Sequence, residues 1–328
     1  MRGAFIKEIS NVIPNFNGKK YLQPCLDALL HQDYPSFEII LVDNGSSDGS
    51  VAWIKENYPQ IRLIALKENT GFCGGVNAGI SASQAEYVLL LNNDTIVLPG
   101  FIRALAETIQ SSPHIFSCQA KMLQIQDSSK IDDAGNYYCA LGWAFADGKG
   151  KPEKNYSRKK EIFASCAGAA IYRKKILEEI GLFDEEHFAY LEDVDISYRA
   201  KLYGYKNVFC PDAKVLHVGS GTSGSRYNLF KIRYSSRNNI YMIYKNMPLW
   251  QILWNLPLLV GGFAIKTVFF TSKGFGGEYL KGMWNGIRIS LQNREKMVKH
   301  LPGMKRRCIK IQLELYRNIG KRFCSGNH

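Results

Sequence analysis

Acidic residues are scarce in the last third of the chain. From Arg226 to the last residue, 19 lysines and arginines stand against only Glu278, Glu295 and Glu314, a balance of +16. Because the whole chain has 42 basic and 29 acidic residues, its first 225 residues carry 23 basic and 26 acidic groups, a balance of −3. Such asymmetry indicates an anionic partner, either a lipid surface or a nucleic acid. A basic face that is merely solvated is the alternative.

Paired cysteines and a secretory signal are also missing. The eight cysteines show no Cys-x-x-Cys pair and no compact spacing, and the chain does not open with a signal peptide. These absences predict reduced thiols in a cytoplasmic protein. The 328 residues, of which 46% are hydrophobic and 22% charged, suffice for one large globular domain or two.

Charge is absent from the 20 residues between Lys245 and Lys266, a run that includes Trp250 and Trp254. Because Pro248 and Pro257 interrupt the run, we do not expect a single straight membrane-spanning helix. An interfacial or re-entrant segment with tryptophan at headgroup depth fits better, while a pair of core helices and a true span stay open. The composition changes near residue 225, so we expect a catalytic domain over 1–225 and a helical, basic, membrane-associated region over 226–328.

The most informative stretch is YVLLLNNDT, residues 87–95. Val88–Leu91 is an unbroken apolar run, which predicts a central strand covered on both faces. Asn92, Asn93 and Asp94 follow at its carboxyl end, where open α/β sheets bind ligands. Asp94 there could hold a divalent cation, and the cation a diphosphate. A strand that simply stops at a polar turn is the alternative.

Three further apolar runs precede this strand, at residues 9–13, 37–42 and 61–66, with helices expected at 21–31, 51–58 and 76–83. This alternation predicts a parallel, Rossmann-like sheet with right-handed crossovers. Asp43 and Asp94 should then emerge at one edge, beside Pro14 and Asn15. Downstream we expect a helix at 101–111, hairpins and loops over 127–160, and strands at 115–122, 162–173 and 214–218.

Three acids, Glu192, Asp193 and Asp195, directly precede an amphipathic helix expected over 196–202. Acids near a helix N-terminus are favoured by the macrodipole, so capping explains one of them. The other acids, set among aromatic residues that would desolvate them, predict a general base. The pattern does not tell which of the three carboxylates takes that role.

His217 ends the last predicted strand and, with Asp94 on the same face, would suit a divalent metal. The sequence after it, residues 219–224, matches G-x-G-x-x-G. A dinucleotide site would need an acid about 20 residues later, and no Asp or Glu occurs between Asp212 and Glu278. A Gly/Ser loop that closes over a bound phosphate is the better interpretation.

Six segments occur in a characteristic order: VIPNFNG, LVDNGSSDGS, ENTGFCGGVNAGI, LLLNNDT, FAYLEDVDISYRAKLYGY and VLHVGSGT. Together they resemble the inverting nucleotide-sugar glycosyltransferases of family 2, and most closely their bacterial rhamnosyltransferase-like branch. The resemblance covers residues 8–225. It implies a GT-A fold, which is a Rossmann-like three-layer α/β/α arrangement with a mixed, mainly parallel central sheet.

The resemblance also implies residue roles. Asp94 and His217 would hold Mg²⁺ or Mn²⁺, and Asp193 would be the base while Glu192 positions the acceptor or donor. The nucleotide sugar would be bound by Pro14, Asn15, Asn17, Asp43, Asn69, Asn77, Asn92 and Asn93. The Gln-x-x-Arg-Trp element of processive synthases is absent, which favours addition of one sugar.

The implied reaction moves a sugar from a nucleotide-diphosphate sugar, such as dTDP-rhamnose or a UDP-sugar, to a hydroxyl of a glycan acceptor in cell-surface polysaccharide synthesis. Such acceptors are commonly linked to a polyprenyl diphosphate. The basic region would then hold the enzyme at the anionic inner face of the cell membrane. We therefore expect a cytoplasmic, peripheral membrane enzyme that does not bind nucleic acid.

Other functions would leave different signs. A nucleotidyltransferase that makes sugar nucleotides should carry a Gly-rich loop after its first strand, whereas residues 14–18 contain one glycine. A glycoside hydrolase also uses two carboxyls but needs no nucleotide. A non-enzymatic protein with a basic nucleic-acid-binding arm would bind RNA or DNA with a steep salt dependence.

Overall fold

The computed structural model describes residues 7–219, 228–299 and 303–324. Its first part alternates strands and helices: β1 (Ile9–Asn15), α1 (Lys19–Leu30), β2 (Phe37–Asn44), α2 (Ser50–Asn57), β3 (Arg62–Leu66), α3 (Gly71–Ala82) and β4 (Tyr87–Leu91). These are the predicted elements, except that α3 begins five residues earlier than expected. Its first turns contain Gly71, Gly74 and Gly75, which are poor helix formers, and Gly75 packs against Pro14 and Asn44. Packing therefore overrides helix propensity here.

The second part completes the sheet and its cover: β5 (Thr95–Val97), α4 (Phe101–Gln110), β6 (Ile115–Gln124), β7 (Asp127–Asp133), β8 (Asn136–Cys139), β9 (Trp143–Ala146), η1 (Glu153–Asn155), β10 (Lys160–Ile162), β11 (Ala169–Arg173), α5 (Lys174–Ile180), η2 (Glu185–His187), α6 (Glu192–Tyr203) and β12 (Lys206–His217). The sheet order is β10-β12-β6-β11-β4-β1-β2-β3, with β5 paired to β12 and β7 to β6. The strands β3, β2, β1 and β4 are parallel, and β11 is antiparallel to both β4 and β6. The predicted mixed, mainly parallel sheet is confirmed.

Two predicted strands have the wrong bounds. The strand expected over 162–173 is two elements, because only Ile162 belongs to β10 and β11 starts at Ala169; the residues between them lack strand pairing apart from a bridge at Ala164. The strand expected from Lys214 is the end of β12, which starts at Lys206. Pro211 hides this continuity in the sequence, and the pairing register of β12 with β6 shifts around it.

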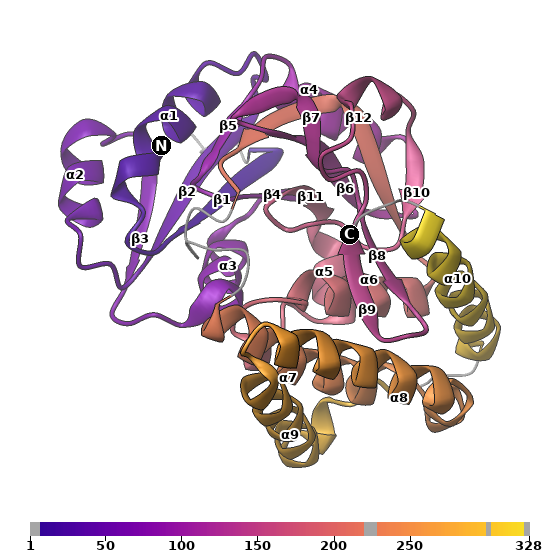
Figure 1. Cartoon of the computed structure of the whole chain (residues 1–328). Coiled ribbons are helices and arrows are strands. Elements are labelled where there is room, and N and C mark those ends of the chain that lie inside the picture. The colour runs from indigo at the N-terminus through magenta and orange to yellow at the C-terminus, as the bar shows by residue number, and fades with distance from the viewer. Residues whose placement is uncertain (1–6, 220–227, 300–302, 325–328) are drawn as a thin grey trace.

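Alternate side chains of the strands enter two separate cores. Ile13, Leu41 and Leu89 pack with α1, α2 and α4 on one face of the sheet, whereas the neighbouring positions Val12 and Leu90 pack with α3, α5 and α6 on the other. Since both faces are covered, the inner strands are apolar at nearly every position. This arrangement gives the three predicted layers (Figure 1). Because the inner positions are apolar, the strand ends are the place for polar side chains.

The C-terminal region is helical, as predicted: α7 (Leu229–Asn246), α8 (Leu249–Ser272), α9 (Gly276–Gln292), the short η3 (Arg294–Lys296) and α10 (Met304–Cys324). Figure 1 shows α7, α8 and α9 grouped on the side of α5 and α6, with α10 standing beside β8. A third core joins this region to the sheet part, since Tyr198 of α6 and Tyr138 of β8 share it with Met242, Leu259 and Leu315. The helices are thus packed firmly on the α/β part.

The apolar helix α8 is continuous, although we expected Pro248 and Pro257 to interrupt it. Pro248 immediately precedes the first helical residue, where a missing N–H costs nothing, and only Pro257 lies inside. Gln251 and Asn255 lie buried on the same helix and both hydrogen-bond Gln312 of α10. This packing stabilises the helix around the proline. Within the described residues, α8 is the one helix long and apolar enough to cross a membrane.

Candidate active site

Polar side chains at the ends of β1 and β2 and just after β4 form a buried hydrogen-bonded chain. Asn93 donates from Nδ2 to Oδ1 of Asn15 (2.7 Å), and Asn15 donates from Nδ2 to Oδ2 of Asp43 (2.8 Å). The other oxygen of Asp43 accepts the Ser46 amide (3.0 Å). Asn15, Asp43 and Asn93 are all at most 6% exposed. Because hydrogen bonds in a buried network reinforce one another, this edge is rigid before any ligand binds.

Gly18 lies against this chain and leaves no room for a side chain. A Cβ at Gly18 would collide with the side-chain amide of Asn93 and lie 2.7 Å from Oδ1 of Asn15. The neighbouring Asn17 is left-handed (φ 51°), and its Oδ1 accepts the Ser47 amide (2.8 Å). The β1–α1 turn therefore closes tightly over the end of the strand, which places it at the same edge as Asp43.

The side chains of two other residues predicted to contact a nucleotide sugar, Asn69 and Asn77, form hydrogen bonds within the protein. Oδ1 of Asn69 accepts from the Gly71 amide (2.9 Å) and from Asn44 (3.1 Å), which shapes the loop before α3. Asn77 donates to the Phe183 carbonyl (2.8 Å) and accepts the Phe183 amide (3.2 Å), which ties α3 to the chain before η2. Both residues order loops around the site in this structure.

Pro14 and Asn92 frame the same edge through their backbones. Pro14 pairs with Val42 in the β1–β2 register and is partly exposed. The Asn92 amide donates to the Gly168 carbonyl (2.9 Å), and the Asn92 side chain packs over Gly168, where a Cβ would come within 2.9 Å of its Nδ2. The small residues before β11 thus allow the end of β4 and the start of β11 to lie close together.

Asp94 and His217 lie together, as predicted. Nε2 of His217 is 3.5 Å from Oδ1 of Asp94, and its Nδ1 is 2.7 Å from Oδ2 of Asp132. Lys149 holds the other oxygen of Asp132 (2.7 Å). Burial by itself would lower the pKa of His217, but the hydrogen bonds to Asp132 and Asp94 outweigh it and raise the pKa to about 9. The imidazole is therefore mainly protonated at neutral pH with one ring nitrogen facing Asp94, and a cation that bound there would displace that proton.

This pair suits a divalent cation that a substrate helps to bind. A metal-binding histidine usually has its other ring nitrogen held by a carboxylate, and Asp132 supplies that contact to His217. In the described part of the chain, no three His, Cys, Asp or Glu side chains are grouped to hold a metal by themselves. Mg²⁺ and Mn²⁺ are often bound by one or two protein ligands together with substrate phosphates. Asp94 and His217 fit that pattern.

The acidic cluster forms the first turn of α6, which begins at Glu192, four residues earlier than expected. Acids in a first helical turn are favoured by the helix dipole, so the predicted acids extend the helix. Asp193 accepts a hydrogen bond from Nδ2 of Asn136 (2.9 Å) and another from the Val194 amide (2.8 Å). Oε2 of Glu192 is buried without a hydrogen-bond partner. An unpartnered buried carboxyl oxygen in a native protein indicates a group that awaits a ligand or a proton.

Burial shifts both carboxyl groups toward neutrality. It is the largest cause that raises the pKa of Glu192 to about 8, followed by the charge of Asp193. It also raises the pKa of Asp193 to about 6, against the hydrogen bonds from Val194 and Asn136. The two neighbouring carboxyls titrate as a pair, and burial with their mutual repulsion favours a state in which they share one proton; a buried carboxylate with a raised pKa is a stronger base than an ordinary one.

Asp195, the third acid, serves the structure. It is fully buried, and it pairs with Arg199 (2.9 Å) and Lys245 (3.0 Å) and accepts a hydrogen bond from Asn246 (2.7 Å). Burial would raise the pKa of Asp195, but Lys245 and Arg199 outweigh it and hold the pKa far below its usual range. A carboxylate held by two cations is a poor proton acceptor, which leaves Glu192 and Asp193 as candidates for the base.

The acids of α6 are linked to the Asp94–His217 pair through residues 132–136. Asp132 contacts His217 and Asn136 contacts Asp193, four residues apart in the chain. Asp133 lies between them, and burial first, and then the charges of Asp132 and Asp193, raise the pKa of Asp133 to about 7. The end of β7 therefore lies between the two groups. Burial, and then the charges of Asp133 and Asp193, also raise the pKa of the Cys166 thiol. Cys166 lies just before β11, which pairs with β4.

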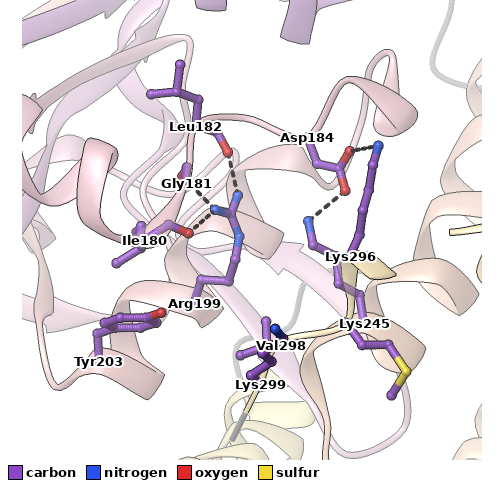
Figure 2. A pocket seen from close by; sticks show the side chains of 11 residues that line it. Ile180, Gly181, Leu182, Asp184, Arg199, Tyr203, Lys245, Lys296, Val298 and Lys299 are labelled. Carbon is purple, nitrogen blue, oxygen red and sulfur yellow. Dashed lines mark hydrogen bonds and ion pairs between the residues drawn. The ribbon is translucent and has the colours of Figure 1, made fainter. Parts of the chain in front are cut away.

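A cavity of about 410 Å³ lies elsewhere and contains none of the predicted site residues. Figure 2 shows Lys245 and Lys296 converging on Asp184, while Arg199 points at the carbonyl oxygens of residues 180–182. These contacts tie the C-terminal end of α7 and the chain after α9 to α6. They support the helix that carries Glu192 and Asp193.

Sequence reasoning missed Asp132 and Asn136, which contact His217 and Asp193. Both lie in the segment DDAGN, residues 132–136, which we expected to form loops and hairpins without a role in the site. The signal that could have found them is this cluster of polar side chains in a short turn beside apolar strand residues. The predicted Gly/Ser loop lies, beyond Gly219, outside the described residues.

Comparisons with known proteins bear on the family and the fold. A family model described as glycosyl transferase family 2 matches residues 10–181. N-acetylglucosaminyl-diphospho-decaprenol L-rhamnosyltransferase of Mycobacterium tuberculosis is 27% identical over 212 residues, which cover 57% of this chain and 68% of the relative.

Two solved structures share the fold. The structure of residues 1–349 of S. aureus TarS superposes with a TM-score of 0.56 at 16% identity, over 98% of this chain and 92% of TarS. The structure of GalNAc-T7 with UDP, GalNAc and Mn²⁺ gives a TM-score of 0.59 at 17% identity, over 74% of this chain; the chain spans about half of GalNAc-T7, 48% of its length. With a family match over more than half of its length, the chain belongs to glycosyl transferase family 2 and is a glycosyltransferase.

Proposed function

We propose that the enzyme transfers one sugar, with inversion, from a nucleotide-diphosphate sugar such as dTDP-rhamnose or a UDP-sugar to a hydroxyl of a lipid-linked glycan acceptor in cell-surface polysaccharide synthesis. The observation that carries the proposal is the position of Asp193, held by Asn136 at the sheet edge that also bears Asp94 and His217. The relative from M. tuberculosis, a rhamnosyltransferase named for a lipid-diphosphate acceptor, supports this choice of substrates.

Asp193 would act as the general base. A sugar hydroxyl is far too weak an acid to attack unaided, so its proton passes to the Asp193 carboxylate as the new bond to the anomeric carbon forms. The bond from that carbon to the diphosphate oxygen breaks on the opposite face, and the nucleoside diphosphate leaves. One direct displacement inverts the anomeric carbon, and no covalent nucleophile is required.

Glu192 and the strand-end residues would position the reactants. Burial and the charge of Asp193 raise the pKa of Glu192, so a proton shared by the two carboxyls can lie on Glu192 and be donated in a hydrogen bond to a sugar hydroxyl. Asn15, Asp43 and Asn93, already linked by hydrogen bonds, would hold the base and ribose of the donor. Because these side chains are already ordered before binding, the protein loses little side-chain entropy when the donor binds.

A divalent cation held by Asp94 and His217 would neutralise charge on the diphosphate when bound. The Mn²⁺ present in the GalNAc-T7 structure supports a metal of this kind. Asp132 keeps one His217 nitrogen occupied, so the other stays directed at Asp94. The Asp94 carboxylate suits either Mg²⁺ or Mn²⁺, whereas the His217 imidazole favours Mn²⁺, because Mg²⁺ prefers oxygen ligands.

The membrane role would belong to α8 and α9. Each carries exposed apolar residues at helical spacing on one stripe: Leu249, Leu253, Leu256 and Val260 on α8, and Leu280, Trp284, Ile287 and Leu291 on α9. Lys281 and Arg288 flank the stripe of α9. Exposed leucine and tryptophan beside basic residues match an anionic membrane surface better than a nucleic acid, which would leave the apolar area in water.

Two experiments test the proposal. Thermal unfolding with Mn²⁺ and a panel of nucleotide sugars should show stabilisation by one nucleotide class, since a ligand of the native state raises its apparent stability. A protein that responds to no nucleotide sugar would contradict sugar transfer. For the membrane role, the protein should sediment with phosphatidylglycerol vesicles more than with phosphatidylcholine vesicles at low salt, and equal sedimentation would contradict it.

A further inference from the structure

The residues directly before Glu192 have a strained backbone. Four described residues other than glycine have positive φ, and three of them are Phe188 (59°), Tyr190 (71°) and Leu191 (66°). A left-handed conformation costs an ordinary residue about 1–2 kcal/mol. Three such residues within four positions persist only if their surroundings hold them, and strain of this kind gathers at functional sites.

One side chain of α7 holds most of this segment. Asn238 is fully buried, and its Nδ2 donates to the carbonyl oxygens of His187 (2.8 Å), Ala189 (2.8 Å) and Tyr190 (2.7 Å). An amide group has two hydrogens, so three acceptors within reach use all of its donor capacity. One buried side chain therefore binds the carbonyl groups of three residues within a span of four.

Arg237 fixes the orientation of that amide. Its Nε donates to Oδ1 of Asn238 (2.9 Å), which keeps Nδ2 turned toward the strained segment. Nη2 of Arg237 donates to the carbonyl oxygens of Glu186 and His187 (3.0 Å for His187). The two residues together bind the backbone of residues 186–190 from one side.

The other side of the segment is held by α3. The Cys73 amide donates to the Phe188 carbonyl (3.2 Å), and Gly71 leaves room for the Phe188 ring, which a Cβ there would meet at 2.6 Å. The strained segment is therefore held between α3 on one side and α7, the first helix of the C-terminal region, on the other. Its last residue, Leu191, is the N-cap of α6, so the helix begins with Glu192 and Asp193 directly after the strained segment.

We infer that Asn238 is a positioning residue for sugar transfer. It acts through the strained segment, residues 187–191, whose conformation directs the first turn of α6 and with it the Asp193 carboxylate. This inference rests on the proposed function, because it assigns Asn238 to the base of that reaction. It also gives the C-terminal region a role in the chemistry besides any role at a membrane.

The chain offers a matched control in the next residue. Asn239 is almost as buried (3% exposed) and lies on the same helix, but it accepts from the Tyr138 hydroxyl (2.7 Å) and donates to the Gly142 carbonyl (2.7 Å). Asn239→Ala therefore removes a comparable buried amide without touching the segment before α6. A role of Asn238 in stability alone predicts the same result for both variants.

The test compares Asn238→Ala and Asn239→Ala in the full chain. We expect Asn238→Ala to lower kcat by about 10²-fold, as a misplaced catalytic group does, with the donor KM nearly unchanged; Asn239→Ala should keep kcat within a few-fold. Asn238→Ser, which retains one donor, should lie between. Equal kcat losses in the two alanine variants would overturn the inference.

Hydrogen exchange gives a second readout that needs no substrate. Amides of residues 187–193 should exchange faster in Asn238→Ala than in Asn239→Ala or the parent protein, because the segment has lost its clasp. Unchanged exchange there would overturn the inference even if the parent protein transferred no sugar. A parent protein that binds no nucleotide sugar would instead overturn the proposed function and leave the exchange comparison to decide on Asn238.

Discussion

The two halves of the proposed active site are held by different means. Asn15, Asp43 and Asn93 stand at strand ends, where the register of a buried parallel sheet fixes them and hydrogen bonds join them directly. Glu192 and Asp193 instead follow a strained segment whose conformation depends on side chains of α7. The comparison teaches that the first half is built by the sheet alone, while the second needs the C-terminal helices.

Among changes outside the proposed base, the largest effect should come from Asp94, which follows the strand end of the sheet half. Asp94→Asn keeps the shape of the side chain but removes its charge, so donor turnover that depends on a divalent cation should fall by about 10²–10³-fold with the fold intact. Turnover of the donor measured with and without Mn²⁺ checks this. Unchanged metal-dependent turnover would remove Asp94 from the site.

A smaller effect should follow from loosening His217. Asp132→Asn removes the carboxylate that holds Nδ1 of His217 (2.7 Å), and loss of such an outer contact should weaken Mn²⁺ affinity by about 10–100-fold. Titration of free Mn²⁺ by electron paramagnetic resonance measures the affinity without any turnover. Asp127→Asn, which changes an exposed aspartate of β7 paired with Lys130, is the control and should bind Mn²⁺ normally.

The helix half can be disturbed from a distance through α9. Gly286 packs against the Arg237 carbonyl of α7, so the methyl group of Gly286→Ala would overlap α7 beside the Asn238 clasp. Overpacking of this kind costs about 1–3 kcal/mol of stability, and kcat should fall several-fold while donor affinity holds. Gly277→Ala, on the same helix with nothing within 4 Å, should leave kcat unchanged. Loss of donor affinity in Gly286→Ala would show that the two halves are not separate.

The smallest effect concerns how the free energy of unfolding of the protein depends on pH through Glu192. Since burial raises the pKa of Glu192 in the folded state to about 8, the folded protein binds a proton that the unfolded chain has released, and stability falls as the pH rises from about 4.5 to 8. Glu192→Gln removes this penalty. It should stabilise the protein by about 1–2 kcal/mol at pH 8–9 and have little effect near pH 4, as measured by denaturant unfolding. Equal effects at both pH values would contradict a raised pKa.

Much of the sheet half could be predicted from the sequence, because short stretches of sequence mark its strands and their ends. An apolar run such as Val88–Leu91 that ends in polar residues marks a strand end, and parallel strands bring their carboxyl ends to one edge. Asn15, Asp43 and Asn93 are therefore found together, and Asp94 is the next residue in the chain. Their exact partners follow from the register, which the hydrophobic pattern sets.

The contacts of the helix half could not be predicted, because they depend on long-range packing. Asn136 follows β7 in a region whose pairing the sequence does not specify, and Asn238 lies more than 40 residues after the acids it supports. Asp195 has the same residue type as Asp193, and its salt bridges to Arg199 and to Lys245, which arrives from α7, separate a structural acid from a catalytic candidate. Pro257 likewise predicts a break in α8 that buried amide contacts prevent.

The central claim is that Asp193 takes the acceptor proton at the edge where the donor is bound. The direct measurement is a comparison of the parent protein and Asp193→Asn by calorimetric titration of the nucleotide sugar with Mn²⁺ present, followed by single-turnover transfer to the acceptor. The account predicts donor affinity within a few-fold of the parent and transfer reduced by about 10²–10⁴-fold. Transfer at the parent rate by Asp193→Asn, with Glu192→Gln inactive instead, would contradict it.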